Sequence, residues 1–579
     1  MGRLRWQLLL VVLALLAIAI LLLARQPLLR AFVAEPAQGG IYIEGLVGRL
    51  GRLNPLLDSA NPTDQDINRL LFNGLVRFDD RGNPQPDLAE SWGVSLDGQL
   101  YNFVLREGLT WHDGQPLTSA DVEFTISLLR NPLLPIPEDV RALWETIEVN
   151  AFDERHIQFS LPIAFAPFLD YVSFGVLPQH LLGDLDAASL MNAPFNLEPV
   201  GSGPYRFDQL ITEGEDVTGV SLTASSDYHF GRPFIDQIVF HYYPSSEVAY
   251  QAYQQGDIQG ISYVDPVILP QVLADSTLNV YTARYPRLSL VLFNLGNASI
   301  PFLQEIGVRQ ALMYGLNRQW IVDQFLDGQA MVADSPILPG TWAYNENIPT
   351  ITFDTDRAIA LLKQAGYTIP AEGGDVRGKE GIPLELELVH PDDELHTRIA
   401  QSIQSNWAEI GVRVELVAVP YIDLVTNYLE TGAYEAALVE LNFSRFPDPD
   451  PYPFWHQAEA TGGQNYSKWD DRRASEYLER ARADFGVSNN QSLRTRLYRN
   501  FQSHFMEELP SLPLFFPVYS YAVSSQIQGV SVGPIFLPSD RFATLNEWFV
   551  IARSQAAELE ATAAPILELP TPGAEDGME

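Results

Sequence analysis

Trp111, His112 and Asp113 are adjacent in the stretch FVLREGLTWHDGQPLTSADVEF, and a histidine beside a carboxylate can act as a general base. A base of this kind needs a nucleophile or a metal-bound water within reach. The chain contains no G-x-S-x-G or H-E-x-x-H pattern and no cysteine. The stretch is therefore interpreted as structural, and the protein is not expected to be an enzyme.

A second cluster, HPDDELH from His390 to His396, offers imidazoles and carboxylates that could bind a metal ion. Its spacing matches no established ligand pattern. The run joins a predicted strand to a predicted helix, where acidic residues stabilise the helix N-terminus. We expect a helix start here, with no metal site and no cofactor.

The segment from Leu438 to Asp471 is the strongest candidate for ligand binding. It interrupts regular structure with four prolines at alternate positions from Pro447 to Pro453, and it is rich in aromatic residues. Prolines stiffen a loop, and aromatic side chains offer large contact areas at low entropic cost. The alternative is a proline-rich surface loop whose aromatic side chains pack into the core.

The elements around these clusters follow from hydrophobic periodicity. Alternation predicts short strands over residues 101–105 and 109–111, followed by an Asp-Gly turn. Thr118, with Asp121 three residues later, predicts a capped helix start. In these predicted elements, every residue around His112 has a structural role.

A β-α-β unit is predicted over residues 384–416, where alternating strands flank a helix that ends before Gly411. Another helix is predicted to begin at Asp354 and stop at Gly366. Units of this kind favour an α/β fold with helices packed on the faces of a parallel sheet.

Composition excludes several classes of protein. The chain has 579 residues and a formal net charge of -37, which argues against binding nucleic acid or an anionic membrane surface. It has no cysteine, so disulfides, thiolate metal sites and a lipid-modified N-terminal cysteine are excluded.

The two ends differ from the rest of the chain. Residues 1–34 include an uncharged run from Leu8 to Ala24 behind Arg3 and Arg5, which predicts an export signal or a membrane anchor. Phe32 makes cleavage after Ala34 unfavourable, so retention as an anchor is preferred. Residues 554–579, rich in Ala, Glu and Pro, predict a disordered acidic tail.

Several stretches resemble one family of proteins. They are LNPLLDSANPTDQDINRLLFNGLVRFD from Leu53, the stretch around His112, VGSGPYRF from Val200, AYQAYQQGDIQGI from Ala249 and VRQALMYGLNRQWIV from Val308. In this order they resemble the extracytoplasmic solute-binding proteins of family 5, which serve ABC importers for oligopeptides, dipeptides and nickel. The resemblance spans roughly residues 41–548.

The resemblance implies a two-lobed, type II periplasmic-binding-protein-like α/β fold with an extra subdomain inserted in the first lobe. Lobe 1 would comprise residues 41–285, with the subdomain at about 61–184, and a return over residues 512–550. Lobe 2 would comprise residues 286–511. Such proteins close their lobes over a ligand by rotation about the crossing segments.

The resemblance also places the proline-rich segment in the ligand cleft. Aligning on Asp448-Pro449-Asp450 puts Arg445 where peptide binders carry an aspartate that pairs with the ligand's amino terminus. An arginine there would favour a carboxylate over an ammonium group; a shifted loop, or pairing with Asp448 or Asp450, is the alternative. The expected ligand-binding residues are Asn294, Phe443, Arg445, Asp448, Trp455, His456 and Tyr466.

The expected function is that of an extracytoplasmic receptor that captures a peptide or peptide-like solute and delivers it to an ABC permease and ATPase complex. The alternative is a ligand sensor or chaperone-like protein of the same fold, without transport. A monomer is expected, outside the cytoplasm or at the outer face of the cytoplasmic membrane, with residues 8–24 as the anchor. No nucleic-acid partner is expected.

Overall fold

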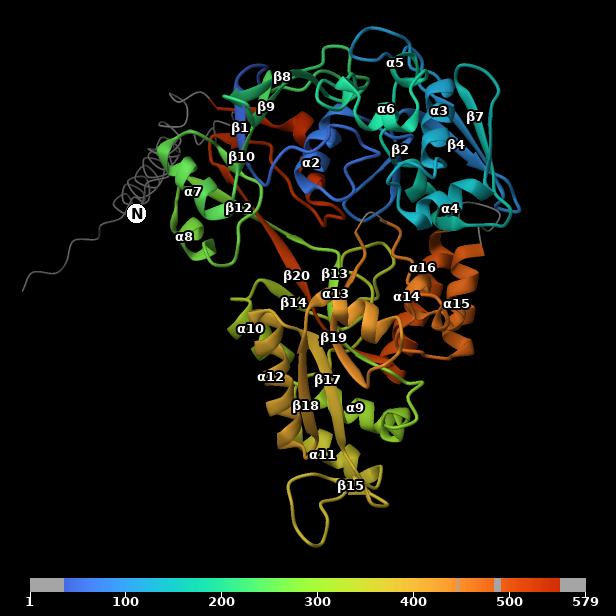
Figure 1. Cartoon of the computed structure of the whole chain (residues 1–579), viewed down its shortest axis with the longest axis vertical. Coiled ribbons are helices and arrows are strands. Elements are labelled where there is room, and N and C mark those ends of the chain that lie inside the picture. The colour runs from blue at the N-terminus through green and yellow to red at the C-terminus, as the bar shows by residue number, and fades with distance from the viewer. Residues whose placement is uncertain (1–35, 445–446, 484–490, 552–579) are drawn as a thin grey trace, which may run out of the picture.

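The computed structural model describes residues 36–444, 447–483 and 491–551, which form two lobes stacked along the long axis of the molecule (Figure 1). The predicted leader or anchor over residues 1–34, Arg445 and the predicted tail over residues 554–579 lie outside the described residues. In the part of the chain that is described, no helix is both long enough and apolar enough to span a membrane.

Lobe 1 is built on a mixed sheet. β1 (Ile41–Val47) pairs in parallel with β10 (Gln237–Tyr243) and β11 (Gly260–Ile261), and β10 continues antiparallel into β9 (Asp216–Ala224) and β8 (Tyr205–Glu213). The helices of this lobe are α2 (Pro62–Leu71), α7 (Ser246–Gln255) and α8 (Leu269–Ala274).

A subdomain with its own sheet is inserted in lobe 1. Its strands run in the order β4 (Ala89–Val94), β5 (Leu100–Leu105), β7 (His156–Ser160) and β6 (Glu148–Ala151), all antiparallel. Helices α3 (Ser119–Leu129) and α4 (Glu138–Thr146) accompany the sheet, and the 3-10 helix η1 (Ala166–Val172) follows it.

Lobe 2 has a second mixed sheet with helices around it. Its strands are β18 (Arg413–Val419), β17 (Glu385–Pro391), β19 (Ala436–Asn442), β13 (Arg287–Phe293) and β14 (Ala330–Val332). The helices are α9 (Ile306–Tyr314), α10 (Arg318–Phe325), α11 (Thr355–Gln364), α12 (Glu394–Glu409), α14 (Tyr452–Trp455), α15 (Arg472–Ala483) and α16 (Gln491–Glu508).

Shorter elements complete the described chain. They are β2 (Val76–Phe78), β3 (Pro84–Pro86), α5 (Gln179–Leu182), α6 (Ala187–Met191), η2 (Pro194–Asn196), η3 (Pro301–Gln304), β15 (Gly378–Lys379), β16 (Ile382–Pro383), α13 (Tyr421–Asp423), η4 (Leu424–Leu429), η5 (Gln457–Ala460), β21 (Ile527–Gln528), η6 (Pro538–Phe542), η7 (Leu545–Glu547) and β22 (Phe549–Val550).

One long strand joins the two sheets. β20 (Ser511–Ser524) pairs with β13 and β14 of lobe 2 up to Pro517, and with β12 (Leu278–Arg284) of lobe 1 from Val518 onward. The chain also crosses between β12 and β13 at Tyr285 and Pro286. The hydrogen-bonding partners therefore change in the middle of β20, a few residues beyond the boundary expected at residue 511, and these crossings are the natural hinge.

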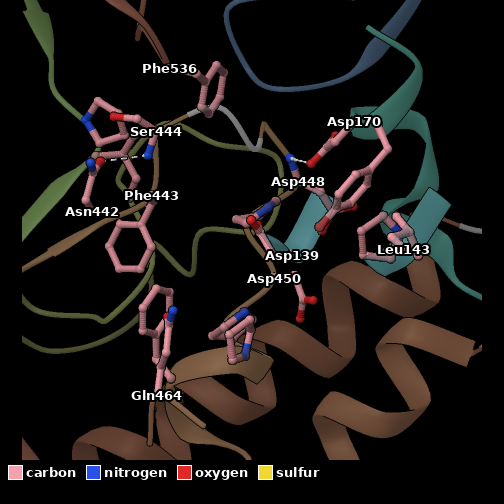
Figure 2. A pocket seen from close by; sticks show the side chains of 18 of the residues that line it. Asp139, Leu143, Asp170, Asn442, Phe443, Ser444, Asp448, Asp450, Gln464 and Phe536 are labelled. Atoms are coloured by element: carbon pink, nitrogen blue, oxygen red, sulfur yellow. Dashed lines mark hydrogen bonds between the residues drawn. The ribbon is translucent and has the colours of Figure 1, made fainter. Parts of the chain in front are cut away.

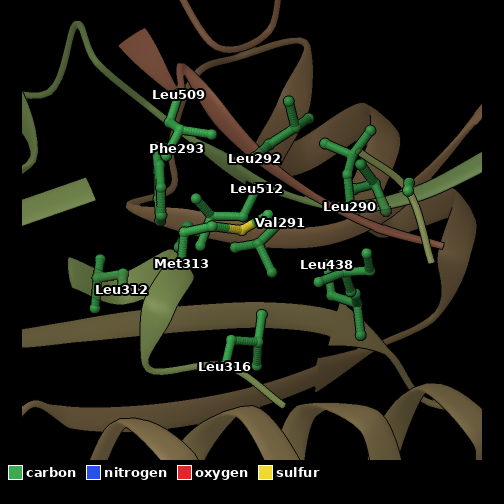
Figure 3. Close-up of a cluster of buried hydrophobic side chains, with 14 of the residues drawn as sticks. Leu290, Val291, Leu292, Phe293, Leu312, Met313, Leu316, Leu438, Leu509 and Leu512 are labelled. Carbon is green, nitrogen blue, oxygen red and sulfur yellow. The ribbon is translucent and has the colours of Figure 1, made fainter. Parts of the chain in front are cut away.

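The core of lobe 2 holds the crossing strands in place. Leucine, valine and phenylalanine side chains of β13 pack against Leu312 and Met313 of α9, against Leu438 of β19 and against Leu512 at the start of β20 (Figure 3). All of them are essentially inaccessible to solvent. Because this cluster spans both crossing strands, it keeps the lobe 2 side of the hinge rigid.

Several local predictions are confirmed. Thr118 and Asp121 form the predicted capping box of α3, and Asp354 caps α11. β17, α12 and β18 form the predicted β-α-β unit with parallel strands. The predicted two-lobed α/β architecture is therefore present.

The strand predicted over residues 109–111 is wrong. Only a single bridge between Thr110 and Pro116 forms there. The backbone N–H of Trp111 donates to Gln115 and that of Leu117 donates to Leu109, so the pairing stops after one bridge. The next N–H, that of His112, donates to Gly201 instead.

Candidate functional site

A cleft of about 1000 Å³ lies between the two lobes and receives residues from every part of the fold. Asp170 of η1 comes from the inserted subdomain, Phe443 and Asp448 come from the loop after β19, and Phe536 comes from the segment that returns to lobe 1 (Figure 2). The crossing residue Tyr285 lines it as well. A hollow walled by both lobes at their hinge is the expected place for a ligand that draws the lobes together.

The loop between β19 and α14 is held in shape by its own polar groups. Ser444 donates its backbone N–H to Asn442 Oδ1 at 2.9 Å, which turns the chain at the end of β19. Asp450 accepts the backbone N–H of Tyr452 at 3.1 Å, at the start of α14. Over residues 447–451, the prolines remove backbone donors and fix φ, which restricts this described part of the loop.

Two partly buried arginines bind the carboxylates of this loop. Arg494 of α16 reaches Asp448 through both terminal nitrogens, at 2.8 and 2.7 Å. Arg482 of α15 donates to Asp450 at 2.6 Å, and its guanidinium lies 3.7 Å above the ring of Tyr452. Bidentate and stacked guanidinium groups restrict orientation, so α15 and α16 fix the cleft loop from behind.

Asp170 connects the two lobes directly. Its Oδ2 accepts the backbone N–H of Asp448 at 3.0 Å, across the cleft (Figure 2). Burial, followed by the negative charge of Asp448, raises the pKa of Asp170 well above its ordinary value. Burial raises the pKa of the neighbouring Asp448 as well, but Arg494 opposes that rise through its charge and its hydrogen bonds.

The wall of the cleft carries charges of both signs. Its charged lining residues are Asp139, Asp170, Asp448, Asp450 and Glu459 against Arg287 and Arg482. Arg482 pairs with Asp450, and Arg494, which stands behind the wall, pairs with Asp448. The preference expected from Arg445, which lies outside the described residues, stays a prediction.

The structure brings together only some of the residues expected to bind ligand. Phe443 and Asp448 line the cleft. Trp455, His456, Tyr466 and Asn294 are absent from the described lining of the cleft, and each has a role elsewhere. Arg445 lies outside the described residues.

Trp455 and His456 face the interior of lobe 2. Trp455 is buried against Phe505, with ring centroids 4.7 Å apart. His456 is stacked on Tyr452 at 4.0 Å and lies 3.1 Å from Glu479 of α15. These two residues secure α14 against α15 and α16.

Asn294 and Tyr466 fasten neighbouring turns. The side-chain amide of Asn294 donates to the carbonyls of Gly432 and Tyr434 at 2.9 and 3.0 Å. Tyr466 is half-buried against the core of lobe 2, and its carbonyl accepts the hydroxyl of Tyr434 at 2.5 Å. Both residues therefore position the strand that leads into the cleft loop.

Other cleft residues escape prediction from the sequence. Asp170 lies far from the proline-rich segment along the chain, Arg482 lies beyond its end, and each sits in an ordinary helical sequence. The only available signal for Asp170 is a carboxylate flanked by apolar residues in APFLDYV, which is common in partly buried helices. The role of Asp170 depends on how the lobes face each other, and that of Arg482 on how α15 packs against α14.

His112 has a structural role. Its Nε2 lies 3.0 Å from the carbonyl of Gly203, and its Nδ1 accepts the backbone N–H of Gly201 at 3.3 Å. Burial lowers its pKa to about 4, so the ring is neutral at pH 7. A Cβ atom at Gly201 would come within 1.9 Å of the Leu71 carbonyl, which explains the glycine in the turn that His112 holds.

The stretch His390 to His396 begins a helix. Asp393 caps α12 by accepting the backbone N–H of His396 at 3.0 Å, and its other oxygen lies 2.7 Å from the ring of the same histidine. His390 is buried and contacts the carbonyl of Pro391. Across the described ranges, no group of three or more His, Asp or Glu residues is arranged to hold a metal ion.

Replacing Asp170 by asparagine should remove a pH-dependent cost. Because the folded-state pKa is raised, wild-type stability falls as pH rises from about 4, the ordinary aspartate pKa, toward the folded value. The asparagine oxygen can still accept the Asp448 N–H and has no charge to bury. We expect a free energy of unfolding about 1–3 kcal/mol higher than wild type at pH 8, and equal to wild type near pH 4.

Urea unfolding across this pH range measures the effect. The exposed Asp184→Asn provides the control and should leave the wild-type pH dependence unchanged. If the free energy of unfolding of wild type and of Asp170→Asn depended on pH in the same way, the raised pKa of Asp170 would be contradicted.

Comparison with known proteins supports the arrangement. The chain is 26% identical over 530 residues to a dipeptide-binding protein of Escherichia coli, covering 87% of this chain and 94% of that protein. It is 27% identical over 513 residues to the oligopeptide-binding protein AppA of Bacillus subtilis, covering 86% and 90%. The crystal structure of NikZ from Campylobacter jejuni, in complex with Ni(L-His), matches with a TM-score of 0.64 at 26% identity, covering 88% of this chain and 99% of that one.

These similarities confirm the predicted type II two-lobed fold, which periplasmic peptide-binding proteins share. Residues 83–464, more than half of the chain, match the family described as bacterial extracellular solute-binding proteins, family 5. Members of that family are solute-binding proteins that lie outside the cytoplasm. The chain therefore belongs to family 5 of the bacterial extracellular solute-binding proteins.

Proposed function

We propose that the protein is the extracytoplasmic receptor of an ABC importer, which captures a peptide or peptide-like solute between its lobes and delivers it to a membrane permease. The observation that carries the proposal is the cleft of about 1000 Å³ walled by both lobes beside the crossing strands. A solute bound there contacts both lobes at once, so binding and lobe closure are coupled.

The chemistry of the wall suits a peptide. Phe443, Phe454 and Phe536 offer apolar contact, while Asn442 and Gln464 offer amide groups that can pair with a peptide backbone. Two relatives are named as a dipeptide-binding protein and an oligopeptide-binding protein, which supports the same class of solute.

Binding without catalysis is the proposed activity. Two of the carboxylates of the cleft, Asp448 and Asp450, are engaged by Arg494 and Arg482. Carboxylates held in this way serve as fixed structure and are poorly suited to act as a general base or nucleophile.

We further propose that the protein is a monomer held at the outer face of the cytoplasmic membrane by residues 8–24. The uncharged run from Leu8 to Ala24 and the absence of a cysteine for lipidation support the anchor. N-terminal sequencing of the mature protein checks the anchor, since a start near residue 35 would show that the segment is cleaved.

Solution scattering with a peptide ligand tests the proposed function. Native mass spectrometry of protein purified from its source first identifies the solute that copurifies. Saturating the emptied protein with that solute should reduce its radius of gyration, because the lobes rotate toward each other about β20. An unchanged radius at saturation would contradict capture by closure.

Deletion of the gene distinguishes transport from sensing. The receptor proposal requires that uptake of the labelled solute be lost in the deletion strain. Unchanged uptake, together with a lost response to the solute, would identify the alternative ligand sensor on the same fold.

A further inference from the structure

A second hollow, the side chamber, adjoins the cleft. It has a volume of about 250 Å³ and lies where α2 of lobe 1 meets α3 and α4 of the subdomain. Ser59, Gln65, Asp170, Tyr171 and Leu537 line both hollows. Since one water occupies about 30 Å³ of liquid, the chamber has room for a ligand group of several heavy atoms.

Most of the chamber wall is apolar. Leu56, Phe72, Leu129, Ile136 and Trp144 line it and are almost fully buried. An apolar wall of this kind binds the hydrocarbon part of a ligand by removing it from water.

Two oxygen acceptors interrupt the apolar wall. Asn68 of α2 donates its side-chain N–H to Asp58 Oδ2 at 2.8 Å, which orients the amide. Its Oδ1 is buried and, within the described part of the chain, has no hydrogen-bond partner. A buried acceptor is unfavourable while it is unpaired, so a donor arriving in the chamber is favoured.

Asp58 also lacks a cation. No basic group acts on its carboxyl among the described residues, and burial raises its pKa to about 7, with a smaller contribution from the charge of Asp64. Arg69, which also lines the chamber, is directed to Asp540, 3.8 Å away. Asp170 is the second acidic residue of the chamber wall, besides Asp58. Apart from Arg69, the described residues of the chamber wall bring no positive charge to Asp58, which suits an incoming positive group.

We propose that the side chamber is a specificity subsite for a ligand side chain with an apolar stem and a terminal cation, as in lysine or arginine. The stem lies against the apolar wall, and Asp58 and Asn68 accept hydrogen bonds from the cationic end. This inference rests on the proposed capture of a peptide in the adjoining cleft.

One further polar group belongs to the same chamber. Trp144 Nε1 is buried and, in the described ranges, has no acceptor. It is a donor, so it cannot bind the cation, and a backbone carbonyl of the ligand is the group that would pair with it. The chamber thus offers acceptors for the cation and a donor for a peptide carbonyl.

A synthetic library Ala-X-Ala-Ala, with X varied over the standard residues other than cysteine, tests the proposal. Native mass spectrometry of the full-length protein, after removal of any bound solute, identifies the library members that bind. We expect members with X = Lys or Arg to bind about 10- to 100-fold more tightly than the member with X = Met, the usual value of a charge-assisted hydrogen bond.

Asp58→Asn should abolish this preference while library members still bind. Val140→Phe, which narrows the chamber from α4 without touching the carboxyl, should exclude Lys and Arg members in the same way. Asp184→Asn, an exposed aspartate of lobe 1, is the matched control and should keep the wild-type ranking.

Proton release provides an independent readout. A cation beside Asp58 favours its carboxylate and lowers its pKa from about 7, so binding Ala-Lys-Ala-Ala at pH 6.5 should release a proton. Calorimetry in two buffers of different ionisation enthalpy detects the release, and Asp58→Asn should eliminate it.

The outcomes separate the two proposals. If no library member binds wild type, the proposed capture of peptides fails. If members bind without preference for Lys or Arg, or if Asp58→Asn keeps the preference, capture stands and the chamber subsite is overturned.

Discussion

Replacing Arg541 by methionine is expected to destabilise lobe 1 by about 3–5 kcal/mol, the cost of leaving buried charges without a partner. Arg541 lies in η6 and is fully buried together with Glu44 of β1 and Asp66 of α2. Its terminal nitrogens lie 2.6 Å from Glu44 Oε1 and 2.6 and 2.8 Å from Asp66. This residue thus connects the returning segment to both N-terminal elements of the lobe.

The loss should depend on pH. Burial already raises the pKa of Asp66, and the charge of Arg541 opposes that rise. Without the guanidinium, the pKa of Asp66 rises further, so the variant loses stability as pH rises above the ordinary value of about 4. The deficit relative to wild type should therefore be larger at pH 7 than at pH 5.

Guanidinium-induced unfolding at both pH values measures the change. Arg69→Met is the matched control, because Arg69 is partly exposed and lies 3.8 Å from Asp540; its loss should cost less than about 1 kcal/mol. Equal stabilities of Arg541→Met and Arg69→Met would show that the buried network contributes little.

Replacing Arg494 by methionine should have the second largest effect, on the cleft itself. Asp448 would keep its buried position and lose both hydrogen bonds from the guanidinium, a change that costs about 3–5 kcal/mol in buried pairs. The methionine side chain still packs against Trp342, over which Arg494 lies at 5.0 Å. The stability lost in Arg494→Met should therefore come mainly from the ion pair and less from packing.

Because Asp448 belongs to the cleft wall, the same variant should also weaken solute binding. Thermal unfolding and calorimetric titration with the copurifying solute measure the two effects. Arg496→Ala, exposed two positions along α16, should change stability by less than about 0.5 kcal/mol. Adding Asp448→Asn to Arg494→Met should recover part of the stability, since it removes the stranded charge; no recovery would argue against the pair as the cause.

The sequence by itself determined the local elements and the fold class. The capping box at Thr118, the capped helix after Asp354 and the β-α-β unit from β17 to β18 are specified by neighbours a few residues apart, because capping and amphipathic periodicity act over one or two helical turns. The strand predicted over residues 109–111 failed because its pairing with residues 115–117 stops after one bridge, and the N–H of His112 is directed to the distant Gly201.

Only the tertiary structure decided which side chains share the cleft. Proline and aromatic residues marked the loop that supplies Phe443 and Asp448, yet the same composition suggested Trp455, which packs against Phe505 in the core. An aromatic residue is equally favourable in a core and in a binding wall, so its type cannot distinguish the two. Asp170 reaches the cleft loop only because β20 sets the two lobes face to face, and Arg482 reaches it because α15 packs against α14. No pattern within their own helices encodes either arrangement.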